Sequence, residues 1–387
     1  MKLYHLLLGA ALCSTVSSCF KDEPLNAECD IEQAYVHLDT PTDVFFAESD
    51  TLINVLSGSD NIVFEVKDGV DLSQMAPMFR LTEGATVSLQ GDKSLQDANG
   101  SVHDFSDGKV VTYVVTSQDG KWTRTYNVSF LVPETPDEYD FENFRLVKGP
   151  NQGQMYEWYD LTDKGYTIAD WATGNGGFNI CMGNAQPEEY PSVPVADGYK
   201  GHAVKLTTLD TGPLGHLQGM RIAAGNLFIG FFNTDIALKD AMGATNFGRS
   251  FDREPISFTG WYKYSPGKTF QDENGKPVSG RTDVGDIYAV LYYNHDDNGD
   301  AFMLHGDDVL TSKYIVAIAR VPEVKTTDNW TEFTVDFDYR QQLDRDLLRN
   351  RGYNLAVVFT SSLEGASFKG AIGSTLYVDE VKVICAD

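Results

Sequence analysis

Hydrophobic and polar residues alternate in short runs along the first third of the chain, which predicts β-strands. In the run Trp122–Val132, the even-numbered residues from Trp122 to Phe130 share one face, as in a half-buried antiparallel strand. Asp119-Gly120 lies between this run and the preceding run 110–116, which predicts a hairpin with a type I′ turn. About seven such runs in roughly a hundred residues are typical of an Ig-like β-sandwich. We place this sandwich at residues 34–133; its other runs are 35–38, 44–47, 52–55, 62–66 and 78–81.

A second, longer set of alternating runs follows a polar linker. Pro133 and Pro136 each end a strand, so we place the linker at 134–140. Residues 141–387 contain strand patterns without interleaved helices, which favours a jelly-roll β-sandwich over a βαβ fold. The predicted fold is therefore all-β, with an Ig-like sandwich followed by a larger jelly roll. Its clearest strands are 203–209, 227–232, 256–264, 287–294, 314–320, 330–339, 355–360 and 376–384, and short helices are predicted at 235–242 and 341–349.

The N-terminus has the pattern of an export signal. Lys2 precedes the apolar run Leu6–Leu12, and small residues lead to Cys19. Val16-Ser17-Ser18-Cys19 resembles a bacterial lipobox, which implies a signal peptide at 1–18 and lipidation of Cys19; the alternative is an ordinary secretory signal with an incidental cysteine. Residues 20–23 resemble an export signal of Bacteroidetes surface lipoproteins. We expect a tether at 19–33 and an outer-membrane protein, exposed at the cell surface and anchored by acyl chains.

The chain is strongly acidic, with 56 Asp and Glu against 30 Lys and Arg and a formal net charge of −26. Such a surface repels nucleic acid and anionic lipid headgroups, so a nucleic-acid partner is excluded. Neutral partners or metal ions are favoured instead.

The cysteines indicate neither a zinc site nor a disulfide framework. After removal of Cys13 with the signal and lipidation of Cys19, Cys29, Cys181 and Cys385 remain, without a Cys-x-x-Cys spacing. Cys181 and Cys385 are expected as small buried residues, with a bridge between them as the alternative.

Several motifs of the larger region resemble those of one protein family. In order, they are Phe141–Phe144, Trp171–Asn175, Ala224–Gly230, Phe247–Phe251, Gly260–Gly267 and Gly373–Val381. Together they resemble the carbohydrate metabolism (PCMD) domain of Bacteroidetes surface proteins, which implies a jelly roll similar to carbohydrate-binding modules and to some glycoside hydrolases. One departure is Arg253-Glu254-Pro255, where an adjacent Arg and Pro are expected. Segments 79–89 and 113–128 resemble the small N-terminal Ig-like domains of gut Bacteroidetes lipoproteins.

Two tryptophans are candidates for sugar contacts, because sugars stack their C–H faces on aromatic rings while polar side chains satisfy the hydroxyls. The first candidate set is Trp171 with Asp170 and Asn175 on a glycine-rich loop. The second candidate set is Trp261 with Lys263 and Arg253. For each tryptophan the alternative is core packing.

The period-two pattern separates the core residues of the strand 256–264 from its outward residues. It places Ile256, Phe258, Gly260, Tyr262 and Tyr264 on the core face of their strand. Trp261 and Lys263 then point outward. On the strand 287–294, Tyr288 and Tyr292 share a face that is either core or the floor of a groove.

Glu142 and Asp379 suggest a structural calcium ion, because terminal strands meet in jelly rolls and calcium binds carboxylate and carbonyl oxygens. The alternative is that both carboxylates lie in solvent at strand ends. The run 295–300 lacks the EF-hand spacing and is interpreted as a hairpin turn at Asn298-Gly299. No other cofactor is indicated.

Three functions remain open. The favoured one is a lipid-anchored surface protein that binds poly- or oligosaccharide through its jelly roll, alongside surface glycan-uptake proteins. The second is a glycoside hydrolase or lyase that uses two facing carboxylates. The third is a structural or adhesion subunit. No Gly-x-Ser-x-Gly or His-Glu-x-x-His motif occurs, and the catalytic residues stay unknown; the acids beside the aromatic motifs are Asp170, Glu254, Asp286 and Glu332.

Overall fold

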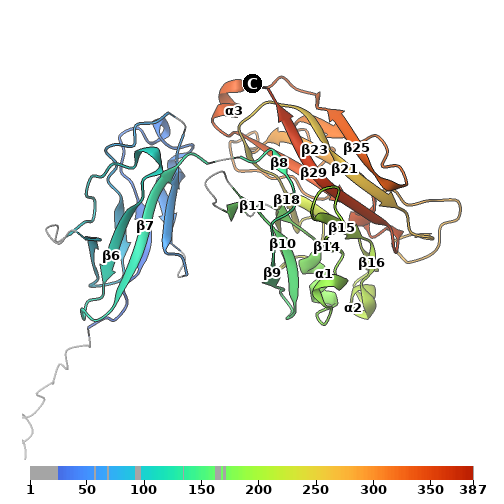
Figure 1. Cartoon of the computed structure of the whole chain (residues 1–387), viewed down its shortest axis with the longest axis horizontal. Helices are drawn as coiled ribbons and strands as arrows, with labels where there is room; N and C mark the ends of the chain where they lie inside the picture. Colours follow the sequence, from blue (N-terminus) through green and yellow to red (C-terminus); the bar gives the residue numbers. More distant parts are fainter. Residues whose placement is uncertain are drawn as a thin grey trace, which may run out of the picture. The chain divides into compact units, whose positions relative to one another are not determined.

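The computed structural model describes residues 25–55, 58–67, 69–91, 97–133, 135–161, 167–168 and 171–386. The chain divides into two compact units, Met1–Pro133 and Glu134–Asp387 (Figure 1). The signal peptide at 1–18 and the lipidation site Cys19 lie outside the described residues. No helix within the described residues is long and apolar enough to cross a membrane.

The first unit is a β-sandwich, as its alternating pattern predicts. Its described strands form one sheet in the order β2-β1-β4 and a second in the order β3-β7-β6-β5, in which β3 runs parallel to β7. Phe64 and Phe130 stack between the sheets with ring centroids 4.7 Å apart. The bounds are β1 Ile31–Tyr35, β2 Leu52–Asn54, β3 Asn61–Glu65, β4 Met78–Leu81, β5 Thr86–Leu89, β6 Val111–Thr116 and β7 Thr123–Leu131, with short 3₁₀ turns at Pro41–Asp43, Glu48–Thr51 and Ser106–Gly108.

Three local predictions in this unit are wrong. Of the run 35–38, only Tyr35 belongs to a strand, because β1 ends there. The run 44–47 forms no strand, because the 3₁₀ turn Pro41–Asp43 leads directly into it and the N–H groups of Val44 and Phe45 both donate to Pro41 O. The β6–β7 hairpin forms, but not through a type I′ turn. Only Gly120, at φ 69°, has positive φ at its centre, and its N–H donates to Ser117 O at 2.9 Å. A single left-handed glycine after a tight turn is typical of longer hairpin loops.

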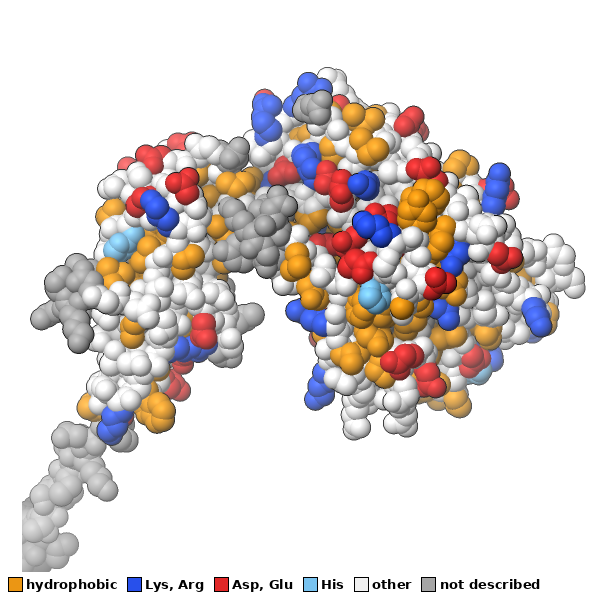
Figure 2. All heavy atoms as spheres, in the orientation of Figure 1, with side chains coloured by type: hydrophobic (Ala, Val, Ile, Leu, Met, Phe, Trp, Pro, Cys, Tyr) orange, Lys and Arg blue, Asp and Glu red, His pale blue; other side chains and the backbone are white. Residues whose placement is uncertain are grey.

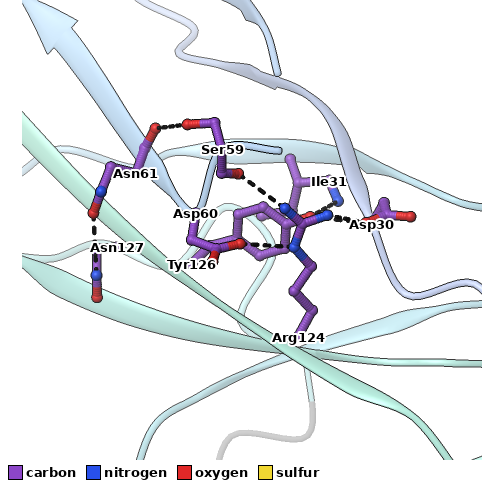
Figure 3. A network of polar contacts seen from close by, with 8 residues as sticks. All are labelled: Asp30, Ile31, Ser59, Asp60, Asn61, Arg124, Tyr126 and Asn127. Atoms are coloured by element: carbon purple, nitrogen blue, oxygen red, sulfur yellow. Dashed lines mark hydrogen bonds and ion pairs between the residues drawn. The ribbon is translucent and has the colours of Figure 1, made fainter. Parts of the chain in front are cut away.

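Arg124 on β7 ties together three segments of the first unit (Figure 3). Its guanidinium donates to the carboxylates of Asp60 and Asp30. Tyr126 lies beside it and donates its hydroxyl to Asp30 at 3.2 Å. This network fixes the segment before β1 and the segment before β3 against β7.

The second unit is a sandwich of two larger sheets with a shared core. We call the first the platform sheet; it has the order β14-β15-β29-β21-β25, with β8 paired to β29. Figure 1 shows β15, β29, β21 and β25 in one layer. The bounds are β8 Glu138–Tyr139, β14 Ser192–Val195, β15 Ala203–Thr207, β21 Pro255–Ser265, β25 Thr327–Asp336 and β29 Thr375–Cys385.

We call the second the covered sheet, because both of its faces are buried. Its order is β13-β18-β27-β23-β24-β26, with β19 paired to β18 and β20 to β27. On β23, Ile287, Ala289 and Leu291 face the shared core, whereas Tyr288 and Val290 pack under covering loops with Leu304 and Val309. The bounds are β13 Trp171–Ala172, β18 Asn226–Phe232, β19 Thr245–Phe247, β20 Arg249–Phe251, β23 Asp286–Tyr293, β24 Ile315–Arg320, β26 Asp338–Tyr339 and β27 Tyr353–Thr360.

The helices of the second unit differ from the predicted ones. Segment 235–242 forms consecutive turns, and segment 341–349 is helical only at α3, Arg345–Arg349, where Asp344 caps the N-terminus. Two short helices were not predicted, α1 Asn175–Cys181 and α2 Gly212–Leu217. Short paired strands complete the unit: β9 Phe144–Lys148 with β10 Gln154–Trp158, β11 Asp160–Leu161 with β12 Thr167–Ile168, β16 Leu209–Asp210 with β17 Ile222–Ala223, and β22 Phe270–Gln271 with β28 Gly370–Ala371.

Cys29, Cys181 and Cys385 are free and partly buried, so the alternative of a Cys181–Cys385 bridge is wrong. The turn at Asn298-Gly299 is confirmed. Gly299 adopts φ 86°, and Asp296 accepts the N–H groups of Asn298 and Asp300.

Candidate functional site

Trp261 and Lys263 point outward from β21, as the period-two pattern predicts. Phe258, Tyr262 and Tyr264 on the same strand are 0–4% exposed and lie in the core. Ile256 departs from the prediction and is 49% exposed. The pairing of β21 with β29 shifts register between Pro255 and Ser257, and this irregularity reverses the faces at the start of the strand.

An aromatic surface extends from Trp261 across the platform sheet. Tyr199, in the loop between β14 and β15, stacks on the Trp261 indole with ring centroids 3.9 Å apart and planes 9° apart. Trp330 on β25 approaches Tyr199 edge-on, with centroids 6.4 Å apart. Tyr377 on β29 lies 6.5 Å from Trp330. We call Tyr199, Trp261, Lys263, Trp330 and Tyr377 the aromatic face.

Lys263 completes this surface by joining two of its rings. Its ammonium lies 4.6 Å from the centroid of the Trp330 ring and 4.8 Å from that of Tyr377. Contacts of this length are cation–π interactions, which hold the flexible lysine in place. Figure 2 shows hydrophobic side chains beside basic and acidic ones on the side of the second unit where Figure 1 draws β15, β29 and β21.

Asp379 anchors the loop that carries Tyr199. Its side chain is 0% exposed, and it accepts the backbone N–H groups of Lys200 at 2.9 Å and Glu380 at 2.8 Å. Burial raises the pKa of Asp379 to about 6, although these N–H groups lower it. The carboxylate therefore acts as a fixed acceptor beneath the loop.

Glu142 binds the other end of the same loop. One oxygen accepts the backbone N–H of His202 at 2.7 Å, and the other lies 2.8 Å from Nδ1 of the His202 ring. Burial raises the pKa of Glu142, but the contacts with His202 lower it below its ordinary value overall. No group of three or more metal-ligating side chains occurs within the described residues. Glu142 and Asp379 thus meet at one loop, and a calcium ion between them stays a prediction.

The prediction that Trp171 offers a ring to a sugar is wrong. Trp171 is 4% exposed, because its strand β13 pairs with β18 over the core. Its indole N–H donates to Asp160 at 2.9 Å, and Tyr139 and Phe141 pack edge-on against it.

The neighbours proposed for Trp171 do not complete a site either. Asn175 is fully buried and exchanges two hydrogen bonds with the backbone of Ser192. It therefore holds the start of α1 against β14 and cannot reach a ligand at the surface. Asp170 lies outside the described residues.

Arg253 does not join the aromatic face. Its guanidinium donates to the carboxylate of Asp137 and to the backbone carbonyl of Thr135. It therefore fixes the first part of the predicted linker 134–140, whose later residues form β8 and pair with β29.

The acids beside the aromatic motifs have different surroundings. Glu254 pairs with Arg345 at 2.9 Å, and Asp286 binds Arg320 through both oxygens at 2.9 and 2.8 Å. Glu332 is exposed on β25 and is the cross-strand neighbour of Trp261, so its carboxylate lies beside the aromatic face.

The alternation of residues along the strands could have predicted two further members of the aromatic face, Trp330 and Tyr377. Trp330 has the same parity along its strand as the outward Glu332, and Tyr377 lies between the buried Leu376 and Val378 on β29. Period-two counting could therefore have found both. Tyr199 lies in a loop, where no periodic pattern places a side chain.

Comparisons with known proteins agree with this architecture. Residues 140–384 match a family model described as "Putative carbohydrate metabolism domain", PCMD, and residues 44–129 match a model described as "SGBP, N-terminal". No curated protein gives a significant match.

The solved structures that are similar to the chain include two from Bacteroides species. A crystal structure from Bacteroides thetaiotaomicron, titled a putative glycoside hydrolase, is 36% identical, with 95% of this chain and 99% of that chain covered and a TM-score of 0.66. A second structure with the same title wording, from Bacteroides vulgatus, is 37% identical, with 65% and 98% covered and a TM-score of 0.61. The chain therefore belongs to the PCMD carbohydrate metabolism family and has an N-terminal domain of the SGBP type.

Proposed function

We propose that this protein binds a glycan chain on the aromatic face of its second unit. The observation that carries the proposal is the group of four aromatic rings on the outer side of the platform sheet, where Tyr199 is 47% exposed. A soluble domain gains nothing in folding from a ring left in water, and adjoining exposed apolar groups usually mark a binding surface.

The chemistry of the face suits a sugar. The exposed ring of Tyr199 can stack on the C–H side of a pyranose. Lys263 and Glu332 flank the rings and can donate to and accept from sugar hydroxyls. Because the Trp261 ring is already stacked with Tyr199, Trp261 acts mainly by supporting Tyr199.

Glycan hydrolysis is the second candidate, because the two Bacteroides structures described above are titled putative glycoside hydrolases. That reaction needs two carboxylates facing each other at about 5–9.5 Å. Next to the aromatic face, Glu332 is exposed, whereas Asp379 is buried beneath the Tyr199 loop. This arrangement supports binding more than hydrolysis.

A place at the cell surface agrees with the SGBP-type N-terminal domain. We extend this to an acyl anchor on Cys19 in the outer membrane, which would bring the glycan site close to surface glycan-uptake proteins. Metabolic labelling with an alkyne fatty acid tests the anchor. Label that is absent from Cys19→Ala supports it, and an unlabelled wild-type protein rejects it.

Calcium at Glu142 and Asp379 is a separate proposal that rests on their shared loop. Chelation with EDTA should lower Tm if the ion is present. An unchanged Tm together with no calcium by elemental analysis rejects it.

A screen of plant, host and microbial polysaccharides tests the function itself. Retention of the protein by one glycan class without released sugar supports binding, whereas release of reducing sugar supports hydrolysis. Self-association or protein capture without glycan retention would favour a structural or adhesion subunit.

A further inference from the structure

A cavity of about 240 Å³ lies on the outer side of the covered sheet. Its floor is formed by β18, β23 and β27. Its other walls come from α1 and from the segments 211–224, 232–247, 306–310 and 362–368. This is far from the outer surface of the platform sheet, because the shared core separates the two sheets. The apolar part of the lining includes Phe178, Phe228, Phe232, Met242, Val309 and Phe368.

The polar groups of the lining include several that adjoin one another on the sheet. Asp286 and Tyr288 lie two residues apart on β23 and therefore on the same face. Thr360 is the cross-strand neighbour of Asp286. Ser362 follows two residues later, and its backbone carbonyl accepts from the Thr360 hydroxyl at 3.2 Å.

Tyr288 contributes a hydroxyl to this lining. Its side chain is 6% exposed, and its hydroxyl makes no hydrogen bond to any other residue in the described part of the chain. Burial raises the pKa of Tyr288, so the hydroxyl stays protonated and can both donate and accept. Because Tyr288 lines the cavity, its hydroxyl is available to a hydrogen-bonding group of a bound molecule.

Asp286 places a carboxylate at the same end of the cavity, and its negative charge is balanced by Arg320. Arg320 binds both of its oxygens, and the remaining lone pairs can accept a further hydrogen bond. A cation is not required there. A ligand hydroxyl can donate a hydrogen bond to Asp286 and accept one from Tyr288.

The volume and the apolar lining of the cavity indicate what the ligand carries besides its hydroxyl. A cavity of about 150 Å³ lined by aliphatic and aromatic side chains binds benzene, so 240 Å³ suits a ring system roughly one and a half times as large. The lining favours an aromatic ring over a sugar, because most of the walls are apolar and would leave some sugar hydroxyls unpaired.

We propose that this cavity is a second ligand site, which takes a compact aromatic molecule with a hydroxyl group. The rings lie among the phenylalanines, and the hydroxyl bonds to Tyr288 and Asp286. The site is independent of the proposed glycan binding, since it shares no residue with the aromatic face.

Titration calorimetry with 2-naphthol tests the site on the folded full-length protein. Saturable one-to-one binding is expected. Tyr288→Phe keeps the shape but removes the hydroxyl, and should weaken binding about tenfold, which corresponds to about 1.4 kcal/mol. It should leave the far-ultraviolet circular dichroism unchanged.

Filling variants locate the binding. Val358→Phe enlarges a side chain of the sheet wall, and Ala241→Leu enlarges one of the covering segment, so the second serves if the first fails to fold. Each should abolish 2-naphthol binding, whereas Trp330→Ala on the aromatic face should leave it unchanged. No saturable binding to the wild type, binding that survives Ala241→Leu, or binding lost in Trp330→Ala would overturn the proposal.

Discussion

Asp379 accepts the backbone N–H of Lys200 at 2.9 Å, and this bond connects the last strand of the protein to the loop that carries Tyr199. The loop is held again at His202 by Glu142. Two carboxylates that the sequence marks as possible metal ligands thus position the most exposed ring of the aromatic face.

The stack of Tyr199 on Trp261 leads to a first prediction. Tyr199→Ala removes the exposed ring and should weaken binding of the glycan identified by screening about tenfold, since aromatic contacts contribute about 1 kcal/mol beyond buried area. Tyr199→Phe keeps the stack and should bind within about twofold of the wild type. Isothermal calorimetry measures both, and equal losses in the two variants would show that the phenol hydroxyl, and not the ring, is recognised.

Asp379 gives a prediction on pH. Burial raises the pKa of its carboxyl to about 6, above the value of about 3.9 expected in the unfolded chain. The folded protein therefore binds this proton more tightly than the unfolded chain between these pH values. The resulting stabilisation is fully present below about pH 4 and is lost as the pH rises through about 6.

Asp379→Asn replaces the titrating carboxyl with an amide that does not ionise. The free energy of unfolding of the wild type minus that of Asp379→Asn should fall as the pH is raised from 4 to 7, as measured by urea unfolding at several pH values. A difference that stays flat or rises over this range would contradict the assignment.

Trp171 should matter for stability. Trp171→Ala should lower the free energy of unfolding of the second unit by about 3–5 kcal/mol, because it empties a core position. Trp122 is 61% exposed on the first unit and is the matched control. Trp122→Ala should change stability by no more than about 0.5 kcal/mol, and equal effects of the two variants in thermal unfolding would contradict the buried position of Trp171.

Gly120 tests the turn of the β6–β7 hairpin. A Cβ added at Gly120 would meet no other atom. Gly120→Ala should therefore lower the free energy of unfolding by about 1 kcal/mol through the positive φ of 69° alone. Gly58 is also open but has no positive φ, and Gly58→Ala should be close to neutral. Chemical unfolding that gives the same loss for both variants would show that the turn conformation is not the cause.

Much of the fold follows from alternation along the chain. The outward position of Trp261 and Lys263 and the buried Phe258, Tyr262 and Tyr264 were predictable, because a strand places successive residues on opposite faces. Alternation fails where the ladder is irregular. Ile256 is exposed because β21 shifts register against β29 just before Ser257.

The site was less predictable, because it depends on contacts between distant segments. A glycine-rich loop around Trp171 gave no sign that β13 would pair with β18 over the core. Tyr199 reaches Trp261 only because its loop is anchored by Asp379, which is 180 positions away in the chain, and by Glu142. Arg253 likewise binds the linker at Asp137, an ion pair that no local motif encodes.

The most direct test of the account compares Trp330→Ala with Trp122→Ala in binding the glycan identified by screening. Trp330 belongs to the aromatic face, and Trp122 is an exposed tryptophan on the first unit. We predict that Trp330→Ala loses about tenfold or more in affinity, or about 1.4 kcal/mol, while Trp122→Ala keeps the affinity of the wild type. Unchanged binding in Trp330→Ala would contradict glycan recognition by the aromatic face.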